Sequence, residues 1–436
     1  MTTRPNFDEG WNLLGLERDD LQRFQVGYGK GSIEFSIPRN NLLGVLEPND
    51  VKPQRSGIDE IRHALAHPIG APRLRDIVKP GERVAIVTSD VTRPMPSKLA
   101  LPPVLDELEA AGVSFEDVVV VFALGSHRKQ TAEEHIQLVG EDVYARVRCL
   151  DSDGMDCRNM GITSRGTPVD VFRPVADADR LICLGNIEFH YFAGYSGGAK
   201  ALMPGVSSRA AIQANHRGMV RADARAGALE DNSLRLDIEE AATLRPIDFI
   251  LNVVLDEHKS VLKAVAGHHV LAHREGCRFL DQLYKVSIPA KADIVIVTPG
   301  GYPKDINLYQ AQKALDNSKN AVRDGGVVIL AAACTEGLGE EVFERWMLSA
   351  QSPGQLIADI QENFVLGGHK AAAIALVMKK ARICLVSDLD PDFSRSLFFE
   401  PQDSVDKALQ AALGEFGPSA TVLFMPYGGS TLPALD

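Results

Sequence analysis

The chain has 436 residues, 45% hydrophobic and 24% charged, a composition typical of a globular protein and unlike that of a disordered or fibrous one. Its formal net charge of −12 argues against nucleic acid or an anionic membrane as a partner, because both require a basic surface. The length predicts two domains.

Two further features bear on the compartment. The initial segment MTTRPNFDEGW has no apolar core of the kind found in secretory signals, and no apolar run is long enough to span a bilayer. The six cysteines are far apart and form no C-x-x-C pair, which indicates reduced thiols rather than a zinc site or a disulfide framework. We therefore expect a cytoplasmic protein, and the sequence sets no oligomeric state.

The first predicted elements form a hairpin, because FQVGYGK and SIEFSIP alternate apolar and polar residues on either side of a glycine. A first series of buried strands and helices follows, with strands at 82–90, 117–127, 180–189 and 247–256 and helices at 98–112, 131–140 and 273–286. A second series has strands at 292–301, 325–333, 381–389 and 420–429, with a helix at 307–322 and several more before the third strand.

Buried strands that alternate with helices predict parallel βαβ units. The fold class is therefore α/β, with two α/β domains of mainly parallel sheets and an active-site cleft between them. We place the domains at residues 1–287 and 288–436, with a boundary near 287–291, and allow the last helix and strand to return to the first domain. Ligands of such sheets bind outside the carboxyl ends of the strands.

Two loops after strands of the first series carry candidate chemistry. In SDVTRPMPSK, Asp90, Val91, Thr92 and Arg93 follow a strand, and an acid, a hydroxyl and a guanidinium there suit a phosphate, ribose or carboxylate. A capped turn with a surface ion pair is the simpler interpretation. In ALGSHR, an apolar strand brings His127 to the loop edge, where a histidine can exchange a proton near neutral pH.

The third loop lies in FHYFAGYSGGAKALMPGVSSRAAIQANH, residues 189–216. It resembles a phosphate-binding P-loop, but Ala199 and Ala201 replace the second glycine and the metal-binding hydroxyl around Lys200. His190 precedes the glycines. His216 ends a helix predicted to be capped near Ser207. The simpler interpretation of His216 is a histidine that the helix dipole favours at the C-terminus of a helix.

Glycines 194, 197 and 198 of this loop predict a close approach of the backbone to a ligand.

The fourth loop places Tyr309, Gln310 and Lys313 in the first turns of a helix, on one face. That face is either solvated or a wall of the interdomain cleft. The histidines at 268, 269 and 273 lack neighbouring ligands at metal-site spacing and are weaker candidates.

The four loops, in this order, resemble the nickel-dependent lactate racemase family and its homologues that act on other 2-hydroxy acids. The motifs are SDVTRPMPSK, ALGSHR, the H-x3-G-x2-GG-x-K-x3-PG segment with a distal histidine, and YPKDINLYQAQK. The resemblance implies two α/β domains with the active site in the cleft between them. It also implies that proteins of cofactor biosynthesis supply the chain with its nickel cofactor.

That cofactor is the nickel-pincer nucleotide, a pyridinium-3,5-bisthiocarboxylic acid mononucleotide whose nickel is held by two sulfurs, a ring carbon and one protein histidine. The resemblance implies a thioamide link to Lys200 and a nickel ligand at His216. Imidazole and sulfur donors suit nickel(II) in a tetragonal site. Residues 90–93 would bind the cofactor.

The resemblance further assigns the acid/base roles to His127 and His190, and substrate binding to Arg93, Tyr309, Gln310 and Lys313. It implies a racemase or epimerase that inverts C2 of a 2-hydroxy acid by reversible hydride transfer, through a planar 2-keto acid. The sequence leaves open a larger substrate than lactate, such as a sugar acid, a dicarboxylate or an aromatic hydroxy acid. A nucleotide-binding protein without turnover is the alternative of another class.

Overall fold

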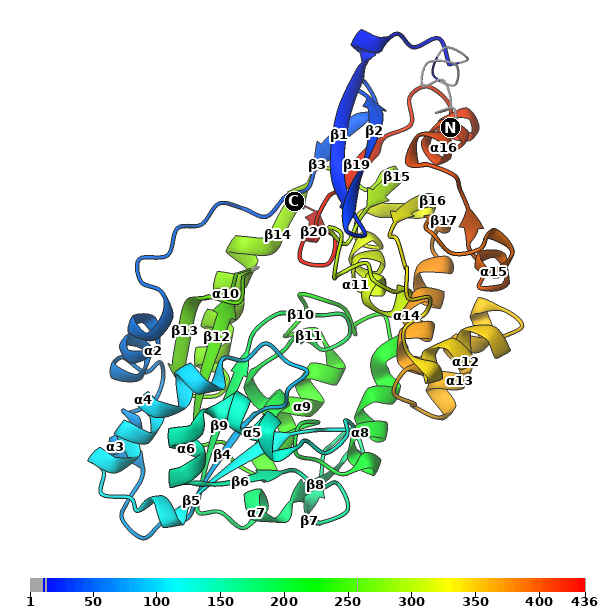
Figure 1. Cartoon of the computed structure of the whole chain (residues 1–436). Coiled ribbons are helices and arrows are strands. Elements are labelled where there is room, and N and C mark those ends of the chain that lie inside the picture. Colours follow the sequence, from blue (N-terminus) through cyan, green and yellow to red (C-terminus); the bar gives the residue numbers. More distant parts are fainter. Residues whose placement is uncertain (1–10, 12–13, 257, 436) are drawn as a thin grey trace. The chain divides into compact units, whose positions relative to one another are not determined.

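A computed structural model describes Trp11, residues 14–256 and residues 258–435 of the chain (Figure 1). The chain forms two compact units. One is made of residues 50–283, and the other joins the described residues up to Asn49 with those from Tyr284 onward. Residues 1–10, for which the sequence predicts no secretory signal, lie outside the described residues. Among the helices that the structure describes, none is long and apolar enough to cross a lipid bilayer.

The unit of residues 50–283 is built on a six-stranded sheet with the order β13-β12-β9-β4-β5-β6. The strands are β4 (Val84–Ser89), β5 (Val118–Ala123), β6 (Arg148–Asp151), β9 (Arg180–Asn186), β12 (Phe249–Leu255) and β13 (Val261–Gly267). Neighbouring strands run parallel except β12 and β13. The central strands are buried on both faces, which explains their uninterrupted apolar sequences.

The sheet is flanked by helices, among them α2 (Gly57–Ala66), α4 (Ser97–Ala110), α5 (Ala132–Val139), α6 (Glu141–Arg146), α9 (Ser233–Leu244) and α10 (Leu271–Tyr284). Apolar residues of α2 and α4 pack with those of the strands in one core. The predicted start of α5 is confirmed, since the Thr131 hydroxyl accepts from the Glu134 N–H and the Glu134 side chain accepts from the Thr131 N–H. This unit also holds the short hairpin β7 (Cys157–Ile162) and β8 (Pro168–Phe172).

The strand order places β4 between β5 and β9. The chain proceeds from β4 to β5 and β6 on one side, and continues later through β9 and β12 on the other. The loops that leave β4 and β9 therefore diverge at the carboxyl edge of the sheet. In open α/β sheets such a switch point is where ligands bind.

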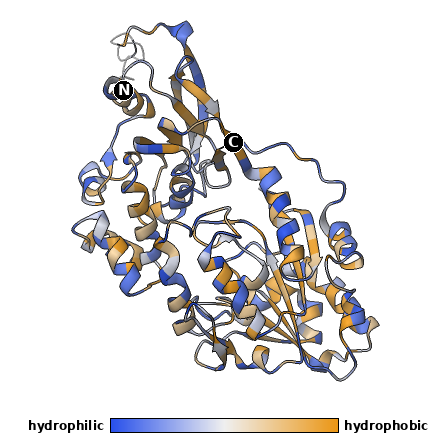
Figure 2. Cartoon of the chain, turned by 180° about the vertical axis from the view of Figure 1, so that it is seen from behind, coloured by the Kyte–Doolittle hydropathy of each residue, from blue (hydrophilic) through white to orange (hydrophobic). Residues whose placement is uncertain are grey.

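The second unit contains a six-stranded parallel sheet with the order β18-β17-β16-β15-β19-β3. Its strands are β3 (Leu42–Val45), β15 (Ala292–Val297), β16 (Val322–Ala331), β17 (Arg382–Val386), β18 (Glu400–Pro401) and β19 (Val422–Met425). β14 (Lys285–Ile288) and β20 (Leu432–Leu435) pair beside it. In Figure 2 the strands of the sheets are coloured mainly as hydrophobic, whereas the helices show both colours, as expected of elements with one buried side.

Two separate cores cover the faces of this sheet. Val295 and Val297 pack with α11 (Leu308–Ser318), α12 (Glu341–Ser349), α13 (Pro353–Glu362) and α14 (Gly368–Met378). Ile294 and Ile296 face the other way, toward α16 (Val405–Phe416) and the antiparallel hairpin of β1 (Leu21–Tyr28) and β2 (Gly31–Pro38). The predicted hairpin and the predicted α/β class with mainly parallel sheets are therefore confirmed. The helix α15 (Pro391–Ser396) precedes β18.

The division into units differs from the expected domains at 1–287 and 288–436 in the place of the first residues. β3 pairs with β19, and the β1–β2 hairpin shares a core with α16, so the described residues up to Asn49 belong with the C-terminal part of the chain. The last helix and strand stay in that unit. A sequence pattern cannot foresee this because an isolated hairpin gives no sign of the sheet on which it packs.

Candidate functional site

Asp90 and His127 form a close pair at the carboxyl ends of two neighbouring strands. Asp90 directly follows β4, and His127 follows β5 after a turn in which its N–H donates to the Leu124 carbonyl. Asp90 Oδ2 lies 2.6 Å from His127 Nδ1, and the Thr92 hydroxyl donates to Asp90 Oδ1 at 2.7 Å. Asp90 is 2% exposed, so this carboxylate is largely removed from water.

The electrostatics of the pair favour an ionised Asp90. Burial raises the pKa of its carboxyl group, but the hydrogen bond and charge of His127, with the Thr92 hydroxyl, outweigh burial and hold the pKa below its usual value. A carboxylate that accepts from Nδ1–H leaves the imidazole lone pair on Nε2. The sequence assigned Asp90 to the cofactor alone, whereas the structure places it against the proposed base.

The next three residues of this loop, 91–93, are exposed. Val91 is 36% exposed, and its N–H donates to Gln130 Oε1 at 2.7 Å. The Gln130 amide in turn donates to Asp151 at 2.9 Å, so the next loop fixes the conformation of this one. The Arg93 N–H donates to the Asp90 carbonyl, and its side chain is exposed.

The ring of Phe192 brings together the three other predicted residues of this unit. The His190 and His216 rings contact it edge-on, with centroid distances of 4.4 and 4.9 Å. Lys200 Nζ lies 5.7 Å from the same centroid. Sequence reasoning missed Phe192 because an apolar side chain in HYFAGY carries no chemical signal of its own.

Lys200 lies in the short 3-10 helix η3 (Gly198–Ala201) and is partly exposed. Burial of the amine lowers its pKa well below the usual value, and the nearby charges of Arg93 and Arg235 act in the same direction. A lysine that loses its proton more readily is a better nucleophile. A neutral amine can form a covalent link, whereas a permanently protonated one could not, so this lowered pKa suits a covalent role for Lys200.

His216 is the last residue of α8 (Arg209–His216) and is 7% exposed. Its Nδ1 lies 3.0 Å from Asn215 Oδ1. Asn215 Nδ2 donates to Asp237 at 2.7 Å, which fixes the orientation of the amide and makes Oδ1 the acceptor for His216. The proton of His216 is thus on Nδ1 and the lone pair on Nε2, the form in which imidazole binds a metal. The helix cap is Ser208 rather than Ser207, one residue from the prediction.

The glycines before Lys200 pack closely against other parts of the same unit. All three have positive φ, and a Cβ at Gly194 would lie 1.8 Å from the Ala228 carbonyl oxygen. At Gly197 it would lie 2.8 Å from Asn252 Oδ1, and at Gly198 2.8 Å from Arg235 Nη2. The glycines therefore allow close packing of the loop on the protein itself, and the predicted close approach of this backbone to a ligand stays a prediction.

Tyr309, Gln310 and Lys313 belong to the other unit, in the first turns of α11. Gln310 and Lys313 are exposed, as predicted for one helix face. Tyr309 is partly buried against the ring of Phe343, with centroids 5.6 Å apart, and Lys370 Nζ lies 3.8 Å from its ring centroid. The Lys370 ammonium also donates to the Tyr309 carbonyl at 2.6 Å.

These residues fit the cofactor that the sequence resemblance implies. Within the described ranges, no group of three or more His, Cys, Asp or Glu side chains could hold a metal ion. A cofactor that brings its own sulfur and carbon donors needs only one protein nitrogen, and His216 Nε2 could supply it. The amine of Lys200 can form the covalent link, and the Arg93 guanidinium suits an anionic group.

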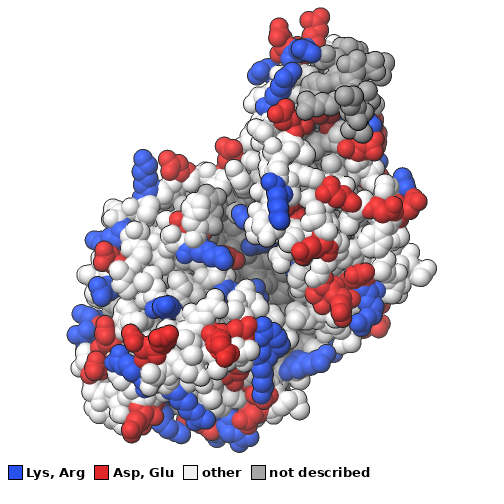
Figure 3. Space-filling model, in the orientation of Figure 1, with Lys and Arg blue, Asp and Glu red and all other residues white. Residues whose placement is uncertain are grey.

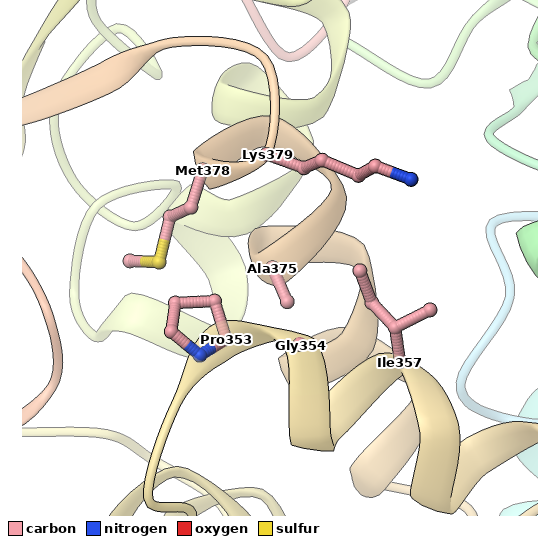
Figure 4. A pocket seen from close by; sticks show the side chains of 6 residues that line it. All are labelled: Pro353, Gly354, Ile357, Ala375, Met378 and Lys379. Atoms are coloured by element: carbon pink, nitrogen blue, oxygen red, sulfur yellow. The ribbon is translucent and has the colours of Figure 1, made fainter.

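A pocket of about 350 Å³ lies in the unit that ends the chain, and none of these residues lines it (Figure 4). The residues that line it, from α13 and α14, are Pro353, Gly354, Ile357, Ala375, Met378 and Lys379. Its lining lacks a histidine, a carboxylate or an arginine, so it offers no acid/base pair. Charges on the face seen in Figure 3 are of both signs and interspersed, not uniformly basic.

Comparisons with known proteins agree over nearly the whole chain. Residues 28–227 match the lactate racemase N-terminal domain family, and residues 288–432 match the lactate racemase C-terminal domain family. A lactate racemase from Thermoanaerobacterium thermosaccharolyticum is 32% identical over 424 residues, which cover 94% of this chain and 99% of the relative. A lactate racemase from Lactiplantibacillus plantarum is 32% identical over 414 residues, with 92% and 97% covered.

Solved structures give the same result for the fold. The apoprotein of the lactate racemase from Thermoanaerobacterium thermosaccharolyticum superimposes with a TM-score of 0.84 at 32% identity, covering 95% of this chain and all of the other. A protein from Thermotoga maritima superimposes with a TM-score of 0.62 at 18% identity, over 89% of this chain and all of the other, and shows likeness of fold alone.

Proposed function

The chain belongs to the lactate racemase family and is thus an isomerase of the racemase type, and we propose that it inverts C2 of a 2-hydroxy acid by reversible hydride transfer. The observation that carries the proposal is the gathering of His190, Lys200 and His216 around one aromatic ring. Such an arrangement suits a covalently held group that needs one imidazole ligand and a base beside it.

The proposed cofactor is the nickel-pincer nucleotide, linked to Lys200 and ligated by His216. When bound, it would supply an electron-poor carbon that accepts hydride from C2 and returns it. Residues 90–93 would bind it, with the Arg93 guanidinium on an anionic group. The lowered pKa of the Lys200 amine supports the covalent link, since acylation requires the neutral amine.

The chain's own acid/base groups would be His127 and His190. Inversion needs a proton acceptor for the hydroxyl of either isomer, so two bases on separate loops are expected. Ionised Asp90 supports His127 in this role, because it holds the Nδ1 proton, leaves Nε2 as the acceptor and stabilises the imidazolium that forms. A nucleotide-binding protein without turnover would have no need of such a pair.

The substrate carboxylate needs a fixed anchor while the C2 centre becomes planar and is then reformed. We propose Arg93, Gln310 and Lys313 for this task, with Tyr309 as a further contact, because charge-assisted hydrogen bonds hold a carboxylate in one orientation. These groups recognise only the HO–CH–COO⁻ unit that all 2-hydroxy acids share. Lactate is the first candidate substrate, since the two curated relatives are lactate racemases.

A larger 2-hydroxy acid, such as a sugar acid, a dicarboxylate or an aromatic acid, is the alternative. Phe189 and Met95, which flank the lysine loop and the Asp90 loop in sequence, are 9% and 4% exposed and pack inside their own unit. We expect side-chain selection to depend on other residues. A screen of holoprotein against single enantiomers of these acids, read by chiral chromatography, would identify the substrate, and inversion of none of them would contradict the proposal.

We propose further that cofactor-biosynthesis proteins load the chain in the cytoplasm. The test of loading is the nickel content and intact mass of protein produced with and without those proteins. Nickel and a mass increase that maps to Lys200 are expected only in the first preparation. An unmodified Lys200 in protein that racemises its substrate would contradict the covalent link.

A further inference from the structure

A buried polar network lies directly beneath the loop that carries Lys200. Its centre is Arg235 of α9, which is fully buried, and His273 of α10, also fully buried. Sequence reasoning treated His273 as a weak metal candidate. The catalytic roles proposed above use neither residue.

The carbonyl groups of three successive loop residues face this network. Arg235 Nη1 lies 3.3 Å from the Tyr195 carbonyl oxygen and 3.4 Å from that of Gly197. His273 Nε2 donates to the Ser196 carbonyl at 2.8 Å. Each backbone carbonyl from residue 195 to residue 197 therefore accepts a hydrogen bond from Arg235 or His273.

The next loop residue is held from the other side. The Gly198 N–H donates to Oδ1 of Asn252, a buried residue of β12, at 2.7 Å. A Cβ at Gly198 would lie 2.8 Å from Arg235 Nη2 and 3.0 Å from the His273 ring, so the guanidinium and imidazole pack directly against this glycine. Gly198 begins η3, and Lys200 follows two residues later.

Each charged group of the network has a partner of opposite charge, and each donor has an acceptor. Arg235 Nε donates to Glu239 at 2.8 Å, and Arg274 also pairs with Glu239 at 2.7 Å. Because His273 Nε2 donates to Ser196, its Nδ1 carries the lone pair and accepts from Arg235 Nη2 at 3.1 Å. Burial and the charge of Arg235 lower the pKa of His273 well below its usual value, so the ring is neutral, as this arrangement requires.

We propose that Arg235 and His273 are positioning residues, which fix the backbone of residues 195–198 and thereby hold Lys200 in place for attachment of the cofactor. The role of Lys200 rests on the proposed function, whereas the fixing of the loop does not. Regular structure in this loop with three glycines is limited to the two-residue strand β11 (Gly194–Tyr195) and to η3, so the buried hydrogen bonds from Arg235 and His273 supply order that secondary structure does not.

Arg245 offers a matched control in the same unit. It is also buried, at 6% exposure, and donates to three backbone carbonyls, those of Val175, Pro246 and Ala178. None of these belongs to the lysine loop. Loss of either arginine removes a buried cation that holds irregular backbone, but only Arg235 contacts residues 195–198.

The test uses the full-length apoprotein and hydrogen–deuterium exchange of peptides covering residues 195–201. We expect about tenfold faster exchange there in Arg235→Gln and His273→Leu. His273→Gln, which keeps a donor for Ser196, and Arg245→Gln should exchange in this peptide as the wild type does. Unchanged exchange in Arg235→Gln, or an equal increase in Arg245→Gln, would overturn the proposal.

A second readout is the fraction of chains with a mass adduct at Lys200 after production with the cofactor-biosynthesis proteins. That fraction should fall at least about fivefold in Arg235→Gln and His273→Leu, and stay near the wild-type value in His273→Gln and Arg245→Gln. An undiminished fraction in the first two variants would contradict positioning. A wild-type chain without any adduct would instead contradict the proposed function and leave the exchange result to decide on the network. If Arg235→Gln does not fold, the pair His273→Leu and His273→Gln carries the test alone.

Discussion

Asp90 Oδ2 and His127 Nδ1 lie 2.6 Å apart, although 37 residues separate the two side chains in sequence. They meet because β4 and β5 are parallel neighbours, so that the loops after these strands leave the same edge of the sheet. The carboxylate determines which ring nitrogen of His127 can accept a proton.

Replacement of this carboxylate by an amide should therefore impair catalysis more than binding. In Asp90→Asn we expect kcat to fall about 10²- to 10⁴-fold, because His127 loses both its tautomer preference and the charge that stabilises its imidazolium. Steady-state racemisation with chiral detection measures the effect. The control is Asp248→Asn. Asp248 directly precedes β12 and pairs with Arg180, the first residue of β9, so its replacement should leave kcat within about twofold of wild type. Equal loss in the two variants would indicate a general effect on folding.

Removal of either proposed base should stop inversion without removing the cofactor. For His127→Gln and His190→Gln we expect losses of about 10²-fold or more in kcat, since each isomer needs an acceptor for its hydroxyl proton. Nickel content and the adduct at Lys200 should remain near wild-type values in both. A variant that keeps wild-type activity would exclude the replaced histidine from the acid/base role.

The lowered pKa of Lys200 predicts unusual reactivity of its amine in the apoprotein. A lysine reacts with acylating reagents only when neutral, so labelling at Lys200 should reach half its maximum at a pH well below the usual lysine pKa of about 10.4. Labelling across pH 6–11 with peptide mass spectrometry measures this, with the exposed Lys304 as internal reference. Half-maximal labelling at the same pH for both lysines would contradict the effect of burial and of the two arginines.

Asp90 gives a second pH dependence, in the stability of the folded protein. Its folded-state pKa lies below the usual value, so it contributes stability that is present above the unfolded pKa of about 3.9 and is lost as the pH falls through the folded value. The difference in unfolding free energy between wild type and Asp90→Asn should shrink as the pH is lowered below about 4. Urea unfolding at several pH values measures it, and a difference independent of pH would argue against an ionised Asp90.

The nickel site should depend on His216 and on the amide that orients it. In His216→Ala we expect nickel to be lost while the mass adduct at Lys200 persists. Asn215→Ala should weaken nickel retention by about 10- to 100-fold, since it removes the acceptor for Nδ1–H. Metal analysis after dialysis against a chelator measures both variants, and full nickel retention in His216→Ala would exclude this ligand.

The sequence predicted the strands, their loops and the α/β class because buried parallel strands and their polar ends leave a local pattern. It also predicted His127, His190 and Lys200 as candidates from their positions after strands. It could not show that the rings of His190 and His216 both contact Phe192, or that Asp90 pairs with His127, because the Phe192–His216 and Asp90–His127 contacts join residues far apart in the sequence.

The glycine loop shows the same limit more sharply. The sequence predicts that the backbone at Gly197 and Gly198 approaches a ligand closely, but it could not show that atoms of Asn252, Arg235 and His273 leave no room for a side chain there. These partners lie 54, 38 and 77 residues from the loop residues that they bond, beyond the reach of any local pattern. The departure from a P-loop, by contrast, is visible in the sequence alone, because Ala199 and Ala201 replace the glycine and the hydroxyl residue that a P-loop requires.

The central claim is inversion of C2 by transfer of its own hydrogen as hydride, and one isotope experiment tests it directly. Nickel-loaded holoprotein is incubated with one enantiomer of lactate carrying deuterium at C2, in ordinary water, and the products are separated by chirality and examined by mass spectrometry. We predict the opposite enantiomer with deuterium retained at C2. Inverted product whose C2 hydrogen comes from water would contradict hydride transfer, and no inversion of lactate or of any other 2-hydroxy acid tested in this way would contradict the proposed function.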